Sequence, residues 1–238
     1  MHWDFAFILL FFAVAVPLLG RRRIRQLLAT SETTMRDRLR LYASTIAFQW
    51  IAVAIILWRA RRHGISLENL GLAMSHPLLT ATLTISLTAL VLGNQLLALK
   101  RLSIPSQSTQ EPLQQVAVRI FPTDNAERIA FFFLVTTVAI CEELIFRGFF
   151  QRAFEIWTGD LAFMGILGSS ALFAWSHLYQ GRKGIAVTFI VGLVFSGVRA
   201  WSGSLLPSAT AHFVADLVVG LMAPSRISAA RGAAPSDN

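Results

Sequence analysis

Long apolar runs alternate with short polar segments along this chain. Seven of the runs come close to the roughly 20 residues that a helix needs to cross a hydrocarbon core about 30 Å thick. They cover residues 3–19, 41–58, 77–99, 129–150, 160–178, 184–200 and 204–222. Apolar residues that gather in runs of this length indicate membrane-spanning helices. The pattern therefore predicts an all-α, polytopic transmembrane helix bundle of about seven helices.

The composition agrees with this prediction. Of the 238 residues, 55% are hydrophobic and only 14% are charged, and the mean hydropathy is +0.59. These values lie outside the usual balance of a soluble domain. Most of the six tryptophans fall toward the ends of the apolar runs, where an amphipathic ring can sit among lipid headgroups. We expect an integral, multi-pass protein of the cell membrane, with the lipid bilayer as its surroundings.

The net charge of +8 is carried by the loops. The basic residues are not gathered on one amphipathic face with aromatic partners, which argues against nucleic acid as a partner. If the N-terminus lies outside, the inside segments hold fifteen Lys and Arg and the outside segments hold six. The positive-inside rule then favours an N-out, C-in orientation. Arg59, Arg61 and Arg62 run against this assignment, because they cluster on the outer side.

Polar groups divide the chain into unequal parts. Residues 1–128 carry three spans and their loops and form an expected scaffold, whereas residues 129–222 hold nearly all the ionisable groups within apolar runs. Residues 223–238 are rich in Ala, Ser, Gly and Pro, which predicts a disordered tail. The single cysteine, Cys141, excludes an intrachain disulfide framework and a cluster of several cysteines around a metal.

An ionisable residue within a membrane helix costs about 2.5 to 3.5 kcal/mol and is a functional-site hypothesis by default. Here such residues come as a set spread over three of the last four runs: Glu142, Glu143 and Arg147, then His177, then His212 and Asp216. We therefore expect a polar cavity in the C-terminal half of the bundle.

Spacing indicates which of these groups can meet. Glu143 and Arg147 are four residues apart, so on a helix they share a face and can form an ion pair that serves packing, function or both. Glu142 points about 100° away from Glu143 and is free to face another helix. If the chain turns at Thr158 and Gly159, antiparallel helices bring Glu142 and His177 to nearly the same depth.

Three motifs follow one another in this half: EELIFR at 142–147, FAWSH at 173–177 and HFVAD at 212–216. Their order and separations resemble the CAAX prenyl protease 2 family, also known as CPBP or Abi membrane proteases. That family shows Glu-Glu-x-x-x-Arg, then Phe-x-x-x-His, then His-x-x-x-Asn. The resemblance covers roughly residues 127–222, and three ordered motifs are far more specific than any one of them.

The resemblance implies an integral-membrane endopeptidase that cuts near the C-terminus of membrane-associated or lipidated proteins or peptides. Glu142 would be the general base and His177 would share the water, while His212 and residue 216 would face the carbonyl oxygen. Glu143 and Arg147 would support the helix or the substrate, and Phe173 would pack one turn before His177. The chain has Asp216 where the family more often has Asn. An ionised Asp can only accept a hydrogen bond, so Asp216 would orient His212, sit protonated or help a metal.

Other interpretations stay open at this stage. Glu142, His177 and His212 are a ligand set that suits zinc, although HExxH is absent and a metal-free reaction is favoured. The same carboxylates and histidines are also consistent with the proton relay of a coupled transporter. A third alternative is a catalytically silent membrane partner or immunity protein of the same fold.

Overall fold

A computed structural model describes residues 3–30, 33–102, 116–117 and 119–232. Within these ranges the regular structure is entirely helical. The elements are α1 (Trp3–Leu10), η1 (Phe11–Ala15), α2 (Val16–Ala29), α3 (Met35–Arg62), α4 (Pro77–Leu102), α6 (Asn125–Glu142), η2 (Glu143–Phe150), α7 (Gln151–Trp157), α8 (Ala162–Ser176), η3 (Leu178–Gln180), α9 (Gly181–Ser202) and α10 (Leu206–Gly232). The predicted all-α fold is confirmed.

Six stretches of helix are long and apolar enough to cross a membrane, which makes this a multi-pass membrane protein. They are Trp3–Ala29, Met35–Arg62, Pro77–Lys100, Asn125–Trp157, Leu178–Ser202 and Leu206–Ala223. Six of the seven predicted runs fall within or largely overlap these helices. Helices are the expected solution because lipid offers no hydrogen bonds to the backbone, and a helix satisfies its backbone groups internally.

The remaining predicted run, 160–178, forms a shorter helix than predicted. Helix α8 has 15 residues and is therefore about 22 Å long, less than the thickness of a hydrocarbon core. It ends at Ser176, and the short 3₁₀ helix η3 then leads to Gly181, whose φ of 74° reverses the chain into α9. His177, which follows the last residue of α8, consequently lies within the bundle and not at its far surface.

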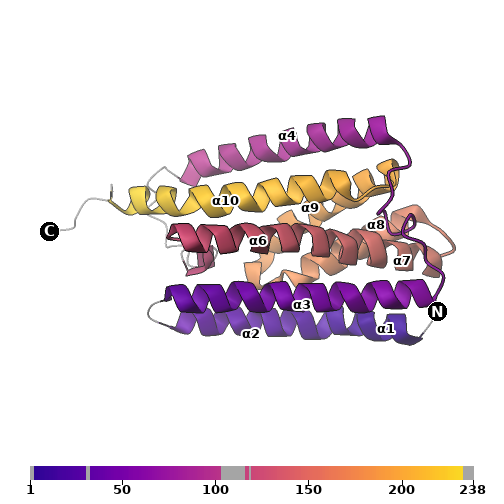
Figure 1. Ribbon diagram of the computed structural model, residues 1–238, viewed down its shortest axis with the longest axis horizontal. Coiled ribbons are helices and arrows are strands. Elements are labelled where there is room, and N and C mark those ends of the chain that lie inside the picture. The colour runs from indigo at the N-terminus through magenta and orange to yellow at the C-terminus, as the bar shows by residue number, and fades with distance from the viewer. Residues whose placement is uncertain (1–2, 31–32, 103–115, 118, 233–238) are drawn as a thin grey trace.

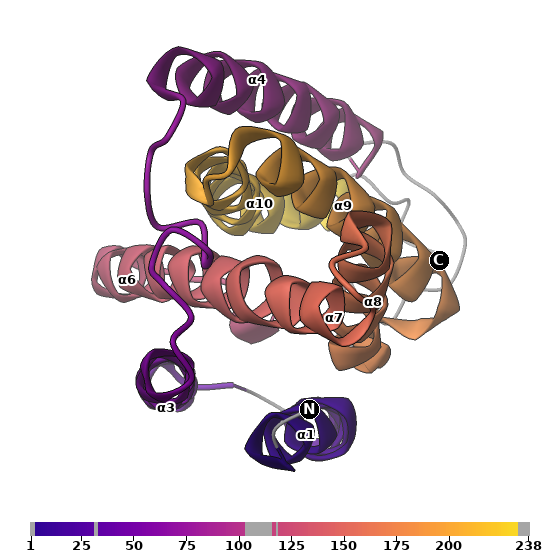
Figure 2. The ribbon, with the colours of Figure 1, turned by 90° about the vertical axis from the view of Figure 1, so that its right-hand side faces the viewer.

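The helices stack in layers. Helix α10 packs chiefly on α4, α8 packs on α9, and α3 packs on α6. Seen from one end, α4 and α10 lie on one side of the α6–α7 rod, and α3 and α1 lie on the other (Figure 2). In the side view α1 begins at one end of the bundle and α10 ends at the other (Figure 1). This arrangement surrounds α6 and η2 with other helices.

The most buried element is η2, a π-helix that continues α6 and leads into α7. All eight of its residues are buried. Its three phenylalanines, Phe146, Phe149 and Phe150, join the largest hydrophobic cluster. A Cβ atom at Gly148 would lie 2.9 Å from the carbonyl oxygen of Leu70, so the loop between α3 and α4 comes into direct backbone contact with η2. The π-helix thus forms the centre on which the other elements pack.

Buried ion pairs join the N-terminal helices to this centre and to each other. Arg38 on α3 reaches Glu127 on α6 at 2.7 Å, and both side chains are buried. Near the opposite end of α3, Asp4 of α1 pairs with Arg59 and lies 2.8 Å from His63. Arg59 is one of the arginines that oppose the predicted orientation, and its pairing with Asp4 offsets much of the cost of its position.

The C-terminal tail differs from the prediction. Helix α10 continues to Gly232, so residues 223–232 are helical and do not belong to a disordered tail. The alanines of this segment have the highest helix propensity of any residue, which allows α10 to extend beyond its apolar part. Residues 233–238 lie outside the described residues.

Candidate active site

The π-helix η2 places Glu143 and Arg147 together in the interior. Arg147 Nη1 donates to Glu143 Oε1 at 3.1 Å, and neither side chain is exposed. The ion pair predicted from the four-residue spacing is therefore present. A buried charge needs such a partner, because taking an ion out of water costs several kcal/mol.

Arg147 also lies against two aromatic rings. The central carbon of its guanidinium is 3.9 Å from the ring centroid of Phe173 and 5.5 Å from that of Phe195. Its Nε and Nη2 atoms have no hydrogen-bond acceptor among the described residues, and the rings replace acceptors there by cation–π attraction. Phe173 is thus more than packing before His177, because it connects the arginine of the first motif to the histidine of the second.

His212 is held by the same carboxylate. Its Nδ1 lies 3.0 Å from Glu143 Oε1, and its Nε2 lies 3.6 Å from Asp216 Oδ2. The first contact is a hydrogen bond, and the second is an ion-pair distance without hydrogen-bond geometry. Glu143 is therefore the group that fixes the ring of His212, and it joins the first motif to the third.

His177 is fixed from the backbone. Its Nδ1 lies 2.8 Å from the carbonyl oxygen of Phe173. Because a carbonyl can only accept, Nδ1 carries the hydrogen, and in the neutral ring Nε2 keeps its lone pair. The ring also packs on Phe173 with 4.6 Å between centroids. His177 can accordingly accept a proton or a hydrogen bond at Nε2.

Glu142 faces away from Glu143, as predicted, and meets α3. Its Oε1 accepts a hydrogen bond from Gln49 Nε2 at 3.1 Å. Its Oε2 is buried and has no hydrogen-bond partner among the described residues. Glu142 is thus a carboxylate with one oxygen in a hydrogen bond to Gln49 and the other oxygen without a partner among the described residues.

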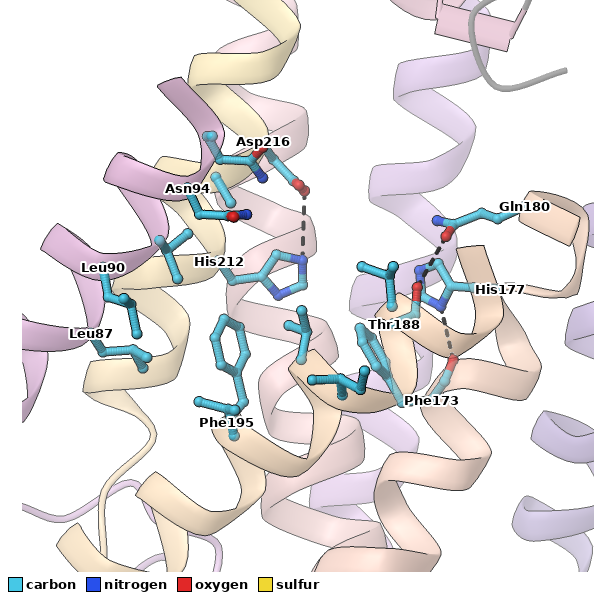
Figure 3. A pocket seen from close by; sticks show the side chains of 17 residues that line it. Leu87, Leu90, Asn94, Phe173, His177, Gln180, Thr188, Phe195, His212 and Asp216 are labelled. Carbon is cyan, nitrogen blue, oxygen red and sulfur yellow. Dashed lines mark hydrogen bonds and ion pairs between the residues drawn. The ribbon is translucent and has the colours of Figure 1, made fainter. Parts of the chain in front are cut away.

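Two cavities meet at His177. The larger one, which we call the apolar cavity, has a volume of about 470 Å³. Figure 3 shows it between α4, α9 and α10, and its labelled lining residues are Leu87, Leu90, Asn94, Phe173, His177, Gln180, Thr188, Phe195, His212 and Asp216. The smaller one, which we call the Glu142 cleft, has about 310 Å³ and lies beside α2 and α3. Gln49, Glu142, Ser176 and His177 are among its lining residues.

The predicted site residues thus gather in two groups that share His177. Glu142 and His177 border the Glu142 cleft, as their predicted equal depth requires. His212, Asp216, Phe173 and His177 border the apolar cavity. Glu143 and Arg147 lie buried behind His212 and line neither cavity. A substrate bound at His177 could therefore contact Glu142 on the side of the Glu142 cleft and His212 on the side of the apolar cavity.

The residues considered as zinc ligands do not form a metal-binding group. In the part of the chain that the structure describes, no three His, Cys, Asp or Glu side chains are placed to hold one ion. Glu142 is bonded to Gln49, and His212 is bonded to Glu143. Among the described residues, these three side chains are therefore not gathered around one position.

Sequence reasoning missed two residues that complete the site. Gln49 lies in an N-terminal span, and its amide inside an apolar run was a signal that could have drawn attention to it. Phe195 has no such signal, because phenylalanines are frequent in this chain and only the fold brings this one to Arg147.

Comparison with known proteins bears on the segment that carries the three motifs. Residues 124–218 match the family model described as Type II CAAX prenyl endopeptidase Rce1-like. The chain is also similar to the Uncharacterized protein YpbD of Bacillus subtilis (strain 168), with 34% identity over 86 residues. That alignment covers 36% of this chain and 41% of the relative. No solved structure matches the chain.

The family match includes all three motifs, so the resemblance predicted from them is confirmed for this segment. At the level of the family it indicates a membrane hydrolase of the CAAX-protease type. The match begins at residue 124, which leaves α1 to α4 outside it.

Proposed function

We propose that this chain, whose residues 124–218 match the Type II CAAX prenyl endopeptidase Rce1-like family, is an integral-membrane endopeptidase. It hydrolyses a peptide bond near the C-terminus of a membrane-associated or lipidated protein or peptide. One observation carries the proposal: Glu142, with one oxygen unpaired, and His177, with Nδ1 fixed, border a common cleft. Such a pair can hold and activate a water molecule.

In the proposed reaction, Glu142 takes a proton from water while the water oxygen forms a bond to the peptide carbonyl carbon. His177 Nε2 accepts a hydrogen bond from the water's other hydrogen, which stays on the oxygen, and so orients the water. The tetrahedral intermediate then breaks its C–N bond, and Glu142 returns the proton to the leaving amine. The products are a new carboxylic acid and a new amine, with one water consumed.

The developing oxyanion needs hydrogen-bond donors. His212 is the best placed, because Glu143 accepts from Nδ1 and thereby directs Nε2 toward Asp216 and the apolar cavity. In the imidazolium form Nε2 also donates, and the oxyanion is its proposed acceptor. Asp216, at 3.6 Å from Nε2, contributes by keeping the ring in this orientation.

The apolar cavity supports a substrate with a hydrophobic chain. Helices α4 and α9 line it with aliphatic side chains, and His177, His212 and Asp216 are polar groups on its wall. The aliphatic part is formed by Leu87, Leu90, Val91, Val187, Ile190, Val191 and Val194. A lipid or other apolar group buried there would leave the attached peptide at His177. Burial of apolar surface from water would contribute about 25 cal/mol per Å² to binding.

The test uses the full-length protein in liposomes with a library of peptides, with and without a C-terminal lipid near the cleavage site. Hydrolysis predicts shortened products whose new carboxyl group carries one ¹⁸O atom when the reaction runs in H₂¹⁸O, as measured by mass spectrometry. Proton or solute flux without cleavage would favour the transporter alternative. Neither cleavage nor flux would favour a silent partner, and either of these two results would contradict the proposal.

A further inference from the structure

A hydrogen bond between Gln49 and Glu142 joins the N-terminal helices to the segment that carries the three motifs. Gln49 lies on α3, outside the family match, and only 7% of its surface is exposed. Its amide nitrogen donates to Glu142 Oε1 at 3.1 Å. A buried amide within an apolar helix is costly unless its groups are paired, so the position of Gln49 requires an explanation.

The amide is only half satisfied by the protein. Gln49 Oε1 is buried and has no donor among the described residues, and the same is true of Glu142 Oε2. The large majority of buried side-chain polar atoms in proteins have a hydrogen-bond partner, counting ordered water. Both of these oxygens are acceptors, so what satisfies them must be a donor.

The surroundings of the two oxygens indicate which hydrogen-bond donor can reach them. The Glu142 cleft, of about 310 Å³, is lined by both Gln49 and Glu142, so a small displacement of either side chain would open the two covered oxygens to a water molecule. A water molecule has two hydrogens and can donate one to each oxygen. His177 borders the same cleft, so this water would lie near both groups of the proposed hydrolytic pair.

We propose that Gln49 is a positioning residue for hydrolysis: its amide nitrogen fixes the Glu142 carboxylate and its amide oxygen orients the attacking water. The inference rests on the proposed function for the reaction that the water undergoes, but not for the contact itself. The N-terminal half then supplies a part of the site and is more than a scaffold. Gln49 acts through Glu142 and the water, so it does not touch the substrate.

A matched pair of variants tests this role. Gln49→Met keeps a flexible side chain of similar length and removes both hydrogen-bonding groups. Trp50→Phe is the control, because Trp50 Nε1 donates to Thr137 Oγ1 at 3.3 Å and thus also joins α3 to α6, without touching Glu142. Each variant removes one hydrogen bond between the same two helices.

The first measurement does not depend on peptidase activity. A hydrophobic carbodiimide modifies carboxyl groups that it can reach within the membrane, and the hydrogen bond from Gln49 occupies Oε1 of Glu142. At neutral pH we expect Gln49→Met to increase labelling of Glu142, quantified by mass spectrometry of the full-length protein, about 3- to 10-fold relative to the unmodified chain. Trp50→Phe should leave labelling within about twofold. Equal labelling in Gln49→Met and the unmodified protein, or an equal increase in both variants, overturns the proposal.

The second measurement separates this proposal from the proposed function. With a peptide that the unmodified protein cleaves, Gln49→Met should lower kcat about 10- to 100-fold, the cost of a misplaced reacting group. KM should stay within about threefold, and Trp50→Phe should retain both constants. An unchanged kcat, or a loss confined to KM, contradicts a positioning role. If no peptide is cleaved while labelling still responds to Gln49→Met, the proposed function fails, the catalytic part of this proposal falls with it, and only the contact between Gln49 and Glu142 stands.

Discussion

At the residue scale, Arg147 holds the three motifs together. It pairs with Glu143, whose other partner is His212, and it lies on Phe173, whose carbonyl oxygen accepts from His177. The ion pair was predictable because four residues separate its members in the sequence. The stacking and the contact to His212 were not, because they join helices that only the fold brings together.

Removing Arg147 should therefore be severe. Arg147→Met removes the cation that pairs with the buried Glu143 carboxylate, and we expect a loss of about 3 to 5 kcal/mol in the free energy of unfolding. Arg147→Lys keeps the charge but not the flat stacking and should lose less. The lone cysteine, Cys141, is fully buried, so a thiol-reactive dye reports unfolding during heating in detergent. The exposed Arg128, replaced by Met, is the control and should unfold within a few degrees of the unmodified protein. Equal stability of all four proteins would contradict the role given to Arg147.

Asp216 allows a gain of activity to be predicted. A carboxylate 3.6 Å from His212 Nε2 can accept but cannot donate to an oxyanion, whereas an amide can donate. We expect Asp216→Asn to raise kcat and Asp216→Ala not to raise it. Steady-state cleavage rates of the two variants and of the unmodified protein show whether kcat rises only in Asp216→Asn. A lower kcat in Asp216→Asn would mean that the charge of Asp216 is required.

At the element scale, two features were not predictable. The segment ELIFRGFF has no sequence signal that distinguishes a π-helix from an α-helix, since all eight residues are buried and their helix-type periodicity is obscured. The run 160–178 is apolar throughout, and its length predicted a full span. Helix α8 ends at Ser176 instead, and the 3₁₀ helix η3 with the positive φ of Gly181 then turns the chain into α9 within the same apolar region. By contrast, the other spans were predictable because their length and hydropathy alone decide them.

The backbone contact of η2 gives a test at this scale. A Cβ at Gly148 would lie 2.9 Å from the Leu70 carbonyl oxygen, and a backbone atom cannot move aside cheaply. Gly148→Ala should therefore lower the free energy of unfolding by about 1 to 3 kcal/mol. Gly197→Ala on α9 is the control, because no atom lies within 4 Å of its added Cβ. The same thiol-dye assay compares them, and equal melting temperatures would show that the loop does not press on η2.

At the scale of the whole molecule, ion pairs lower the cost of several basic residues that oppose the proposed orientation. Of the six basic residues on the proposed outer side, Arg59, Arg147, Arg152 and Arg199 each pair with an acidic side chain. The segments at 21–40 and 100–128 together hold eleven Lys and Arg, and we expect this excess to set the orientation. With the N-terminus outside, the loop between α2 and α3 lies inside and the loop between α3 and α4 lies outside.

Cysteine scanning tests this orientation. In a Cys141→Ser background, we expect Ser66→Cys, between α3 and α4, to react with a membrane-impermeant maleimide added to intact cells. Thr34→Cys, at the start of α3, should react only after the membrane is opened. The reverse pattern would place the N-terminus inside.

The proposed hydrolysis requires Glu142 and His177 to act together on one water molecule. The most direct test is the cleavage rate of four proteins in liposomes: the unmodified chain, Glu142→Gln, His177→Ala and the double variant. Each single substitution should lower kcat by about 10²- to 10⁴-fold. The double variant should be no slower than the worse single variant, because groups that act as a unit are not additive. Cleavage by Glu142→Gln at the unmodified rate would contradict the account.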